Sequence, residues 1–281
     1  MKILVTGAGG MVGNYVAAYL THVGHEVVGT VRRTSSAKEV RTVVCDLSKP
    51  ITIHEEFELI IHTAGALPYR NSTVLQYKQD NIDAMEQLLS FAQAKGIPRM
   101  INLSTIGVYG EFREERIHED SDHINPDPYG QSKEIAERML RECGSVEGIS
   151  LRMPGILGNG ARGIWITNVI EKMKQNAPVT IYSPEFVTTN FVDVYQISVF
   201  ISKLIDRKKW EYDTLVLACS KGNRIGEIVE RTKEKLKSGS EILVGKGDRA
   251  PFWLDASRAV SMGYPESTPA DVVSRFLEGD L

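Results

Sequence analysis

Short apolar runs recur along the first part of the chain, and their pattern predicts buried strands. The runs are rich in β-branched residues and show little alternation, which is typical of strands covered on both faces. They lie at residues 2–7, 25–31, 41–47, 58–65, 99–105 and 149–157. Between most of them, apolar residues recur at helical spacing. Residues 11–24 and 81–96 show this period and end in glycine, a usual helix stop.

The alternation of predicted strands and helices indicates an α/β fold. Such an order favours a doubly wound parallel sheet, here of six strands in two halves, with helices on both faces. After about residue 155 the pattern changes to a mixture of helices and short strands. We therefore expect a main domain over residues 1–155 and a smaller α/β lid over 156–281, with 188–220 returning to the main sheet.

Composition and charge exclude several classes of protein. The chain has 281 residues, of which 42% are hydrophobic and 25% charged, enough for a sizeable core. A net charge of −3 gives no basic surface for nucleic acid. No apolar stretch approaches the roughly 18 residues of a membrane span. The initial apolar run ends at Thr6, too soon for a signal peptide.

The cysteines give no sign of a metal site. Cys45, Cys143 and Cys219 stand far apart and form no metal-ligand spacing. A sparse, odd number of cysteines suits a reducing compartment. We therefore expect a cytoplasmic protein that binds a small molecule, with no metal, no membrane contact and no nucleic acid.

The stretch TGAGGMVG, at the end of the first predicted strand, is typical of a dinucleotide-binding turn. Gly7 allows a tight turn, Gly10 lets a pyrophosphate approach the backbone, and Gly13 lets the following helix pack closely on the sheet. Met11 and Val12 begin that helix, where backbone N–H groups and the positive end of the helix dipole attract phosphate. We expect a pyrophosphate to bind here.

A second set of residues has the chemistry of proton transfer. Tyr129 and Lys133 are four residues apart, so a helix places them on one face, and Asp127 is a suitable cap for that helix. A tyrosine titrates near about 10 when unperturbed, and a nearby ammonium stabilises its phenolate. Ser104 and Thr105 end the fifth predicted strand on the carboxyl side, where open α/β sheets bind ligands. These hydroxyls are candidates to contact a substrate oxygen.

Taken together, these motifs resemble the extended short-chain dehydrogenase/reductase family, the NAD-dependent epimerase/dehydratase group. TGAGGMVG, CDL, HTAGA, LSTIGVYG, YGQSK, LRMPGILGNG, TTNFVDVYQIS and LDASRAVSMGY stand in the family's order over nearly the whole chain. The resemblance implies a Rossmann-like domain with a substrate-binding lid. It also implies a homodimer, because many relatives dimerise through helices that include the YGQSK helix.

The resemblance assigns a role to individual residues. Thr105 matches the catalytic Ser or Thr, Tyr129 the catalytic acid or base, and Lys133 the lysine that binds the cofactor ribose and activates the tyrosine. His62 precedes the HTAGA segment's alanines, and we interpret it as a core histidine. Further cofactor contacts are implied for Asp46 and Leu47 at the adenine, for Ala64, Gly65 and Ala66 under the cofactor, and for Pro154 beside the nicotinamide.

The end of the second predicted strand discriminates between cofactors. NAD-binding sheets carry an acid there for the ribose 2′-OH. This chain has Val31, followed by Arg32 and Arg33, so no carboxylate remains to repel a 2′-phosphate and two guanidinium groups are placed to bind one. We predict a preference for NADP(H), with NAD(H) as the alternative if the arginines are only a solvated pair.

The sequence indicates the family more narrowly than it indicates the reaction. The predicted preference for NADP(H) favours reduction of a keto group, with a nucleotide sugar as the best substrate class. The alternatives are a nucleotide-sugar epimerase with a bound dinucleotide, a reductase of a smaller ketone or aldehyde, and a non-catalytic NADP(H)-binding sensor. A dehydratase is disfavoured because Ile106 and Gly107 stand where it needs acids. Candidate substrate contacts, besides Ser104, are Asn168, Lys246 and Arg249, the last two of which are also read as surface charge.

Overall fold

The computed structural model describes residues 1–33, 40–68, 72–247 and 251–279. The chain divides into two compact units. The first comprises residues 1–111, 122–153 and 197–215, and the second comprises residues 112–121, 154–196 and 216–281. Each unit has its own buried apolar cluster, and each is described by itself.

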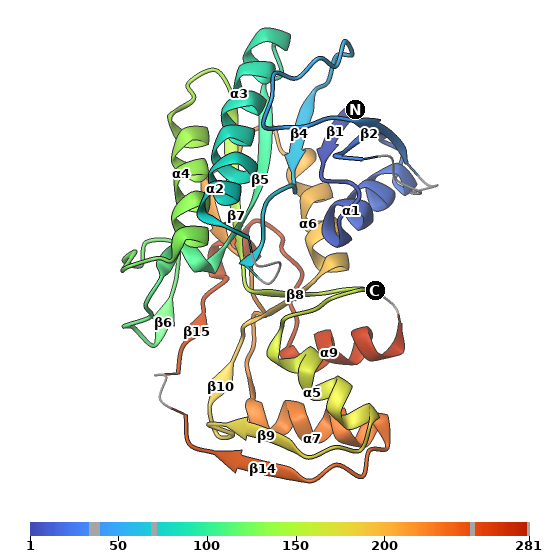
Figure 1. Cartoon of the computed structure of the whole chain (residues 1–281), viewed down its shortest axis with the longest axis vertical. Coiled ribbons are helices and arrows are strands. Elements are labelled where there is room, and N and C mark those ends of the chain that lie inside the picture. Colours follow the sequence, from blue (N-terminus) through green and yellow to red (C-terminus); the bar gives the residue numbers. More distant parts are fainter. Residues whose placement is uncertain (34–39, 69–71, 248–250, 280–281) are drawn as a thin grey trace. The chain divides into compact units, whose positions relative to one another are not determined.

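The first unit is built on the predicted parallel sheet (Figure 1). The strand order is β12-β7-β5-β4-β1-β2-β3. The strands are β1 (Lys2–Thr6), β2 (Glu26–Val31), β3 (Arg41–Val44), β4 (Leu59–His62), β5 (Arg99–Thr105), β7 (Glu147–Met153) and β12 (Thr214–Val216). The pairings from β3 across to β7 are parallel. The doubly wound, Rossmann-like α/β prediction is therefore confirmed.

Two details of the sheet differ from the sequence prediction. The sheet has seven strands and not six: β12, which lies within the 188–220 segment expected to return to this sheet, extends it beyond β7, where the Ser150 amide donates to the Asp213 carbonyl oxygen at 2.8 Å. The run at 149–157 is also not one strand. It ends as β7 at Met153 and resumes as β8 (Gly155–Leu157), because Pro154 has no N–H to continue a ladder.

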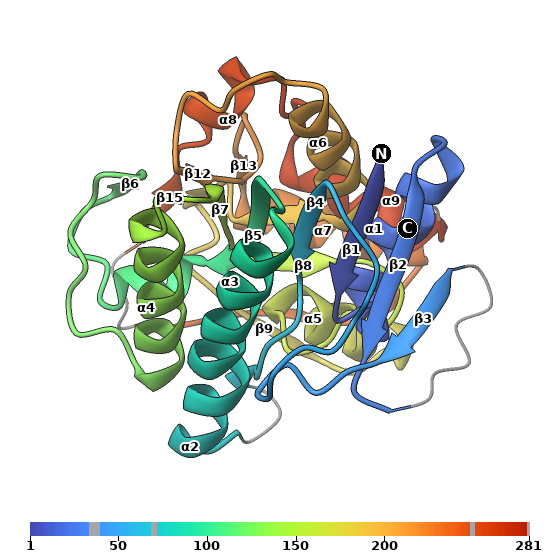
Figure 2. The same ribbon diagram turned by 90° about the horizontal axis from the view of Figure 1, so that it is seen from above.

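Helices cover both faces of this sheet. They are α1 (Met11–His22), α2 (Val74–Tyr77), α3 (Ala84–Lys95), α4 (Pro128–Glu142) and α6 (Val194–Ile205). A π-helical turn, Lys78–Asp83, joins α2 to α3. Figures 1 and 2 show α3 and α4 on one face and α1 on the other. The predicted apolar stripe of α3 is buried in the core of this unit, through Met85, Leu88, Leu89 and Ala92.

The second unit combines helices with short strand pairs. Its helices are α5 (Trp165–Lys174), α7 (Ile225–Leu236), α8 (Ser257–Ser261) and α9 (Pro269–Glu278). Its strands are β6 (Arg116–Ile117), β8, β9 (Val179–Tyr182), β10 (Val187–Thr188), β11 (Phe191–Asp193), β13 (Asn223–Arg224), β14 (Ile242–Gly245) and β15 (Trp253–Leu254). The pairs are β6–β15, β8–β11, β9–β14 and β10–β13. Helix α9, which the sequence analysis does not identify, starts with a capping box of Thr268 and Asp271.

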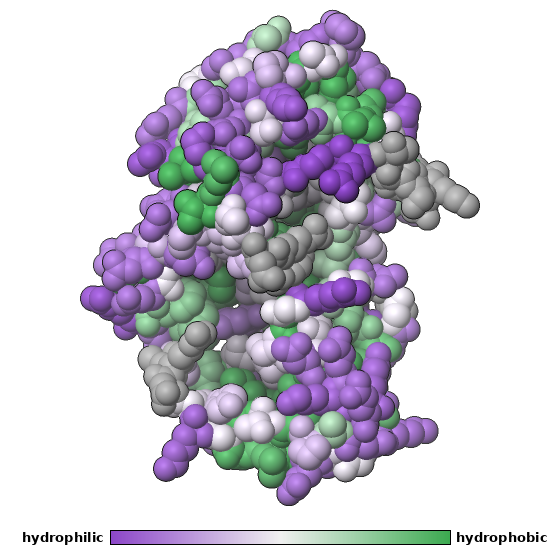
Figure 3. Space-filling model, viewed as in Figure 1, coloured by the Kyte–Doolittle hydropathy of each residue, from purple (hydrophilic) through white to green (hydrophobic). Residues whose placement is uncertain are grey.

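The face of the molecule drawn in Figure 3 is mostly polar. On the face drawn in Figure 3, hydrophilic residues predominate and apolar residues form small separate areas. Along the described ranges, no helix has both the length and the apolar character needed to cross a bilayer. The same ranges contain no cluster of three or more metal-ligating side chains placed to hold a metal ion.

Candidate active site

The glycine turn between β1 and α1 is tight, and the start of the helix is open. A Cβ on Gly13 would lie 2.3 Å from the Gly7 carbonyl oxygen, and Gly7 itself has a φ of +71°. Gly10 is the N-cap, and within the described residues no side chain caps α1 and no acid occupies its first turn. Because the amides of Met11 and Val12 begin an uncapped helix, this end is suited to an anion.

A buried amide connects the segment that follows β4 to the start of α4. Asn81, on the π-helical turn, accepts a hydrogen bond from the Ala66 amide at 2.8 Å and donates to the Ser132 hydroxyl at 2.8 Å. The Ser132 hydroxyl donates in turn to the Tyr129 carbonyl oxygen at 2.7 Å. The sequence analysis missed Asn81. Its position four residues before Met85, on the apolar stripe of the following helix, is the signal that could have identified it.

Thr105 and Tyr129 both lie close to one small residue, Gly107. Thr105 ends β5 and caps a 3₁₀ turn, Ile106–Tyr109, by accepting from the Gly107 amide at 3.1 Å. A Cβ on Gly107 would lie 3.4 Å from the Thr105 hydroxyl oxygen and 3.8 Å from Cδ1 of Tyr129. Asp127 caps α4 through the Gly130 amide at 2.7 Å, as the sequence predicts. The structure thus brings these candidate catalytic side chains to the carboxyl end of β5.

Lys133 lies one turn further along α4 and is buried. Its Nζ donates to the Leu103 carbonyl oxygen of β5 at 2.7 Å. Burial lowers the pKa of Lys133 to about 8, against the opposing effect of the Glu137 carboxylate. His62 is also buried, and Nδ1 shares a hydrogen bond with the Thr6 hydroxyl at 2.7 Å. Burial, followed by the charge of Lys133, lowers the pKa of His62 to about 3, so it is the neutral core histidine that the sequence indicates.

Ser104 is bonded to a buried ion pair. Its hydroxyl donates to Glu137, and the Glu137 carboxylate accepts from Nη2 of Arg152 at 2.8 Å. Glu137 and Arg152 are each only 2% exposed. The Ser104 hydroxyl therefore completes the hydrogen bonding of this pair, and its predicted contact with substrate stays a prediction.

A carboxylate from another part of the chain lies at the end of β2, where the sequence analysis expects none. Val31 ends the strand, and Nη2 of the exposed Arg32 lies 2.7 Å from Oδ1 of Asp80 on the π-helical turn. The expectation that no carboxylate stands near this strand end is therefore wrong. The contact escaped sequence reasoning because its two partners lie far apart in the sequence. Arg33 is exposed.

The remaining predicted contacts are distributed over both units. Asp46, just after β3, accepts from the Ser48 hydroxyl at 2.8 Å, and this hydrogen bond holds its pKa below the usual range. Leu47 packs against the first unit's core, while Ala64 and Gly65 lie in the segment just after β4. In the second unit, Pro154 is half-buried, whereas Asn168 on α5 and Lys246 after β14 are exposed. Arg249 lies outside the described residues.

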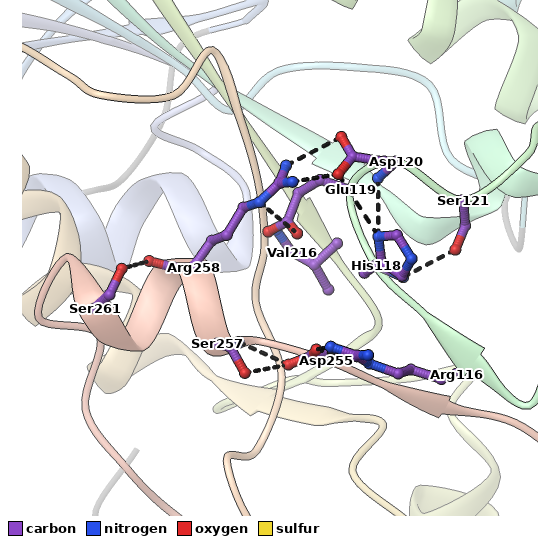
Figure 4. Close-up of polar contacts among 10 residues, drawn as sticks. All are labelled: Arg116, His118, Glu119, Asp120, Ser121, Val216, Asp255, Ser257, Arg258 and Ser261. Carbon is purple, nitrogen blue, oxygen red and sulfur yellow. Dashed lines mark hydrogen bonds and ion pairs between the residues drawn. The ribbon is translucent and has the colours of Figure 1, made fainter.

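A polar network within the second unit holds the loop that continues from the 3₁₀ turn. Figure 4 shows Arg258 facing Glu119 and Asp120, with Arg116 paired to Asp255. Glu119 also accepts from the Val216 amide at 2.8 Å, and burial raises its pKa. Residues 112–121 are thus fastened to the segment around α8, a connection that the sequence patterns do not reveal.

Comparison with known proteins identifies relatives of the chain. Residues 3–216 match the model of a family described as the NAD dependent epimerase/dehydratase family. A UDP-glucose 4-epimerase of Azospirillum brasilense is 29% identical over 160 residues, which cover 53% of this chain and 46% of the relative. The chain spans about half the length of the curated relatives it matches.

Solved structures share the fold at low identity. MoeE5 in complex with UDP-glucuronic acid and NAD superposes with a TM-score of 0.82 at 22% identity, over 100% of this chain and 99% of that chain. UDP-N-acetylglucosamine 4-epimerase from Methanobrevibacter ruminantium M1, in complex with UDP-N-acetylmuramic acid, gives 0.83 at 17% identity, over 99% and 97%. At these identities the likeness establishes the fold.

Proposed function

Because the chain belongs to the NAD dependent epimerase/dehydratase family, we propose that it is a nucleotide-sugar epimerase that works with a nicotinamide dinucleotide. The observation that carries this proposal is the placement of Thr105 and Tyr129 around Gly107, with the buried Lys133 one turn further along α4. The relative from Azospirillum brasilense and the structure from Methanobrevibacter ruminantium M1 are epimerases of UDP-sugars, and the MoeE5 structure holds UDP-glucuronic acid together with NAD. These relatives favour epimerisation over the reduction that the sequence analysis prefers.

The first unit fits the phosphates of a dinucleotide. The uncapped start of α1 offers backbone N–H groups, and the side-chain-free Gly7, Gly10 and Gly13 let the turn pack closely while leaving that end open. When bound, the nicotinamide supplies reversible hydride transfer with the sugar carbon. Met11, Val12, Asp46 and Leu47, together with the Ala64–Ala66 segment, are the further residues we propose for its binding.

The side chains supply the proton chemistry. Tyr129 takes the proton from the sugar hydroxyl during oxidation and returns it during reduction. The Thr105 hydroxyl hydrogen-bonds the same sugar oxygen and holds it beside Tyr129. Lys133, charged below its pKa of about 8, stabilises the phenolate and is held in place by the Leu103 carbonyl. The Asn81 bonds fix the first turn of α4 against the Ala66 segment.

The test is direct conversion of nucleotide sugars. The purified chain is incubated with NAD and one nucleotide sugar at a time. The three sugars are UDP-glucose, UDP-N-acetylglucosamine and UDP-glucuronic acid. The epimers are then separated by chromatography. We expect one of them to be converted, with a loss of about 100-fold or more in Tyr129→Phe. Tyr77→Phe is the matched control, because the Tyr77 ring lies 5.7 Å from that of Tyr129 and has no assigned proton transfer. Equal turnover by wild type and Tyr129→Phe would refute the assignment.

A second candidate is NADPH-dependent reduction of a keto group, on a nucleotide sugar or a smaller ketone or aldehyde. Arg32 and Arg33, beside a strand end that carries Val31, favour binding of a 2′-phosphate and hence NADP(H) over NAD(H). Michaelis constants for NADPH and NADH test this preference. Net consumption of NADPH with a keto substrate supports reduction, whereas epimer formation without net consumption supports epimerisation. Tight NADPH binding with no turnover supports the sensor alternative.

The assembly and the remaining binding residues are proposed on the family resemblance. We expect a homodimer, which sedimentation of the purified chain measures, and a cytoplasmic location, which cell fractionation measures. Pro154 is proposed beside the nicotinamide, and Asn168, Lys246 and Arg249 are proposed to contact the nucleotide sugar. Alanine substitution at Asn168, Lys246 or Arg249 should raise the Michaelis constant for the sugar nucleotide, and Pro154→Ala should raise that for the dinucleotide.

A further inference from the structure

The contact between Arg32 and Asp80 is an ion pair between a guanidinium and a carboxylate at the end of β2. Nη2 of Arg32 lies 2.7 Å from Oδ1 of Asp80. The two side chains are unequally exposed, at 63% for Arg32 and 17% for Asp80. Arg32 follows Val31, the last residue of β2, at the strand end where a dinucleotide-binding sheet recognises the ribose 2′ position.

Asp80 is the better fixed partner of the two. It precedes Asn81 on the π-helical turn, and Asn81 is held on both sides by the Ala66 amide and the Ser132 hydroxyl. Asn81 is 1% exposed, so the backbone that carries Asp80 is anchored in the first unit. Arg32 has a long and mostly exposed side chain, which can turn from Asp80 to another anion.

We propose that Asp80 is a specificity-determining residue that opposes binding of the 2′-phosphate of NADP(H), an inference that rests on the proposed dinucleotide site. The carboxylate that NAD-binding sheets carry at the strand end is replaced here by Val31, and Asp80 supplies a carboxylate from the turn before α3 instead. A 2′-phosphate must draw Arg32 away from Asp80 and then lie near that carboxylate. A 2′-hydroxyl meets neither obstacle.

A second acid on the same turn provides a control that separates the effect of Asp80 on dinucleotide preference from a general effect of altering the turn. Arg33 follows Arg32 and is exposed. Asp83, three positions after Asp80 on the same turn, pairs with Lys78 at 2.7 Å. Since Asp83 carries the same charge but lies against Lys78, it is the matched control for removing one carboxylate from this turn.

The experiment measures dissociation constants of NADPH and NADH for the purified full chain, by the fluorescence of the bound nicotinamide. No substrate or turnover is required. We expect Asp80→Asn to raise the ratio of NADPH affinity to NADH affinity by about threefold to tenfold, a size typical of a partly exposed charge contact. Asp83→Asn should leave the ratio unchanged. Arg32→Gln should lower it, because the 2′-phosphate loses a cation and Asp80 loses its partner.

Further variants keep the proposal falsifiable if Asp80→Asn is unstable. Asp80→Glu keeps the charge and should hold the ratio near that of wild type, whereas Asp80→Ser removes the charge and should raise it. A ratio that does not rise in Asp80→Asn or Asp80→Ser, with both dinucleotides still bound, overturns this inference and leaves the proposed function standing. Failure of the wild-type chain to bind either dinucleotide overturns both.

Discussion

At the scale of single residues, the buried amine of Lys133 is a strongly perturbed group of the candidate site. Lys133 is 5% exposed and is held by a backbone carbonyl, so its charged form loses hydration that one hydrogen bond does not replace. Its pKa falls from 10.5 to about 8 for this reason. A lysine in this state changes its charge within a pH range that enzymes experience.

The lowered pKa predicts a specific pH dependence of stability. Between about pH 8 and 10.5 the unfolded chain binds a proton at Lys133 that the folded chain does not, so the free energy of unfolding rises with pH in that window. Lys133→Met removes this contribution. Urea unfolding at pH 7 to 10.5 should show the wild type gaining roughly 3 kcal/mol relative to the variant as pH rises. Parallel curves for the two proteins would mean that Lys133 has an ordinary pKa.

The glycine turn provides a second prediction at this scale. A Cβ on Gly13 would lie 2.3 Å from the Gly7 carbonyl oxygen and 2.4 Å from the Thr63 hydroxyl, so backbone must move. Gly13→Ala should lose about 1–3 kcal/mol of stability and bind the dinucleotide at least about tenfold more weakly, because α1 is displaced. Gly144→Ala is the control, since a Cβ there meets nothing within 4 Å. Thermal unfolding and dinucleotide titration measure both effects, and equal behaviour of the two variants would contradict the argument.

At the scale of elements, α4 joins the candidate catalytic groups to the sheet. Its N-terminus is set by Asp127, which accepts from the Gly130 amide, and by Pro128 in the first turn. Gly130 packs against the 3₁₀ turn so closely that a Cβ would lie 2.1 Å from the Gly107 carbonyl oxygen. The orientation of Tyr129 therefore depends on how this helix starts.

Removal of the cap should affect stability and activity together. Asp127→Ala leaves the Gly130 amide without its side-chain acceptor and should lower stability by about 1 kcal/mol. It should also reduce the turnover number more than it changes the Michaelis constant, because Tyr129 lies in the loosened turn. Asp127→Ser keeps an acceptor and should behave nearly as wild type in urea unfolding and in kinetics. A loss of activity in Asp127→Ser as large as in Asp127→Ala would point to another role for the carboxylate.

Patterns within single elements were predictable, and contacts between distant elements were not. The apolar runs identified β1 to β5, the stripe identified α3, and Asp127 identified the start of α4, because each signal lies within a few residues. The Arg32–Asp80 and Glu137–Arg152 pairs join separate elements, and neither partner is distinctive in its own stretch of sequence. The position of the short β12 at the edge of the sheet depends on which strands pair, which residue patterns alone do not specify. The break at Pro154, by contrast, follows from the missing N–H of that residue.

At the scale of the whole molecule, each of the two units has a core and a shielded ion pair of its own. In the first unit Glu137 pairs with Arg152, and in the second Asp193, which has no exposed side-chain surface, pairs with Arg275. Removing one partner leaves the other charge buried and uncompensated, which typically costs about 3–5 kcal/mol when both are fully buried. In the second pair, removing Arg275 leaves Asp193 with no exposed surface, whereas removing Asp193 leaves Arg275, which is 30% exposed, so the cost should be smaller for the loss of Asp193.

These pairs allow the independence of the units to be tested. If each core supports its own unit, then Glu137→Gln should increase amide hydrogen exchange mainly in residues 1–111, 122–153 and 197–215. Arg275→Gln should increase it mainly in the remaining residues, because Asp193 then lacks its cation. Peptide-resolved exchange measured by mass spectrometry distinguishes the two patterns. Equal loss of protection throughout the chain in both variants would show that the two units unfold as one and share a single stability.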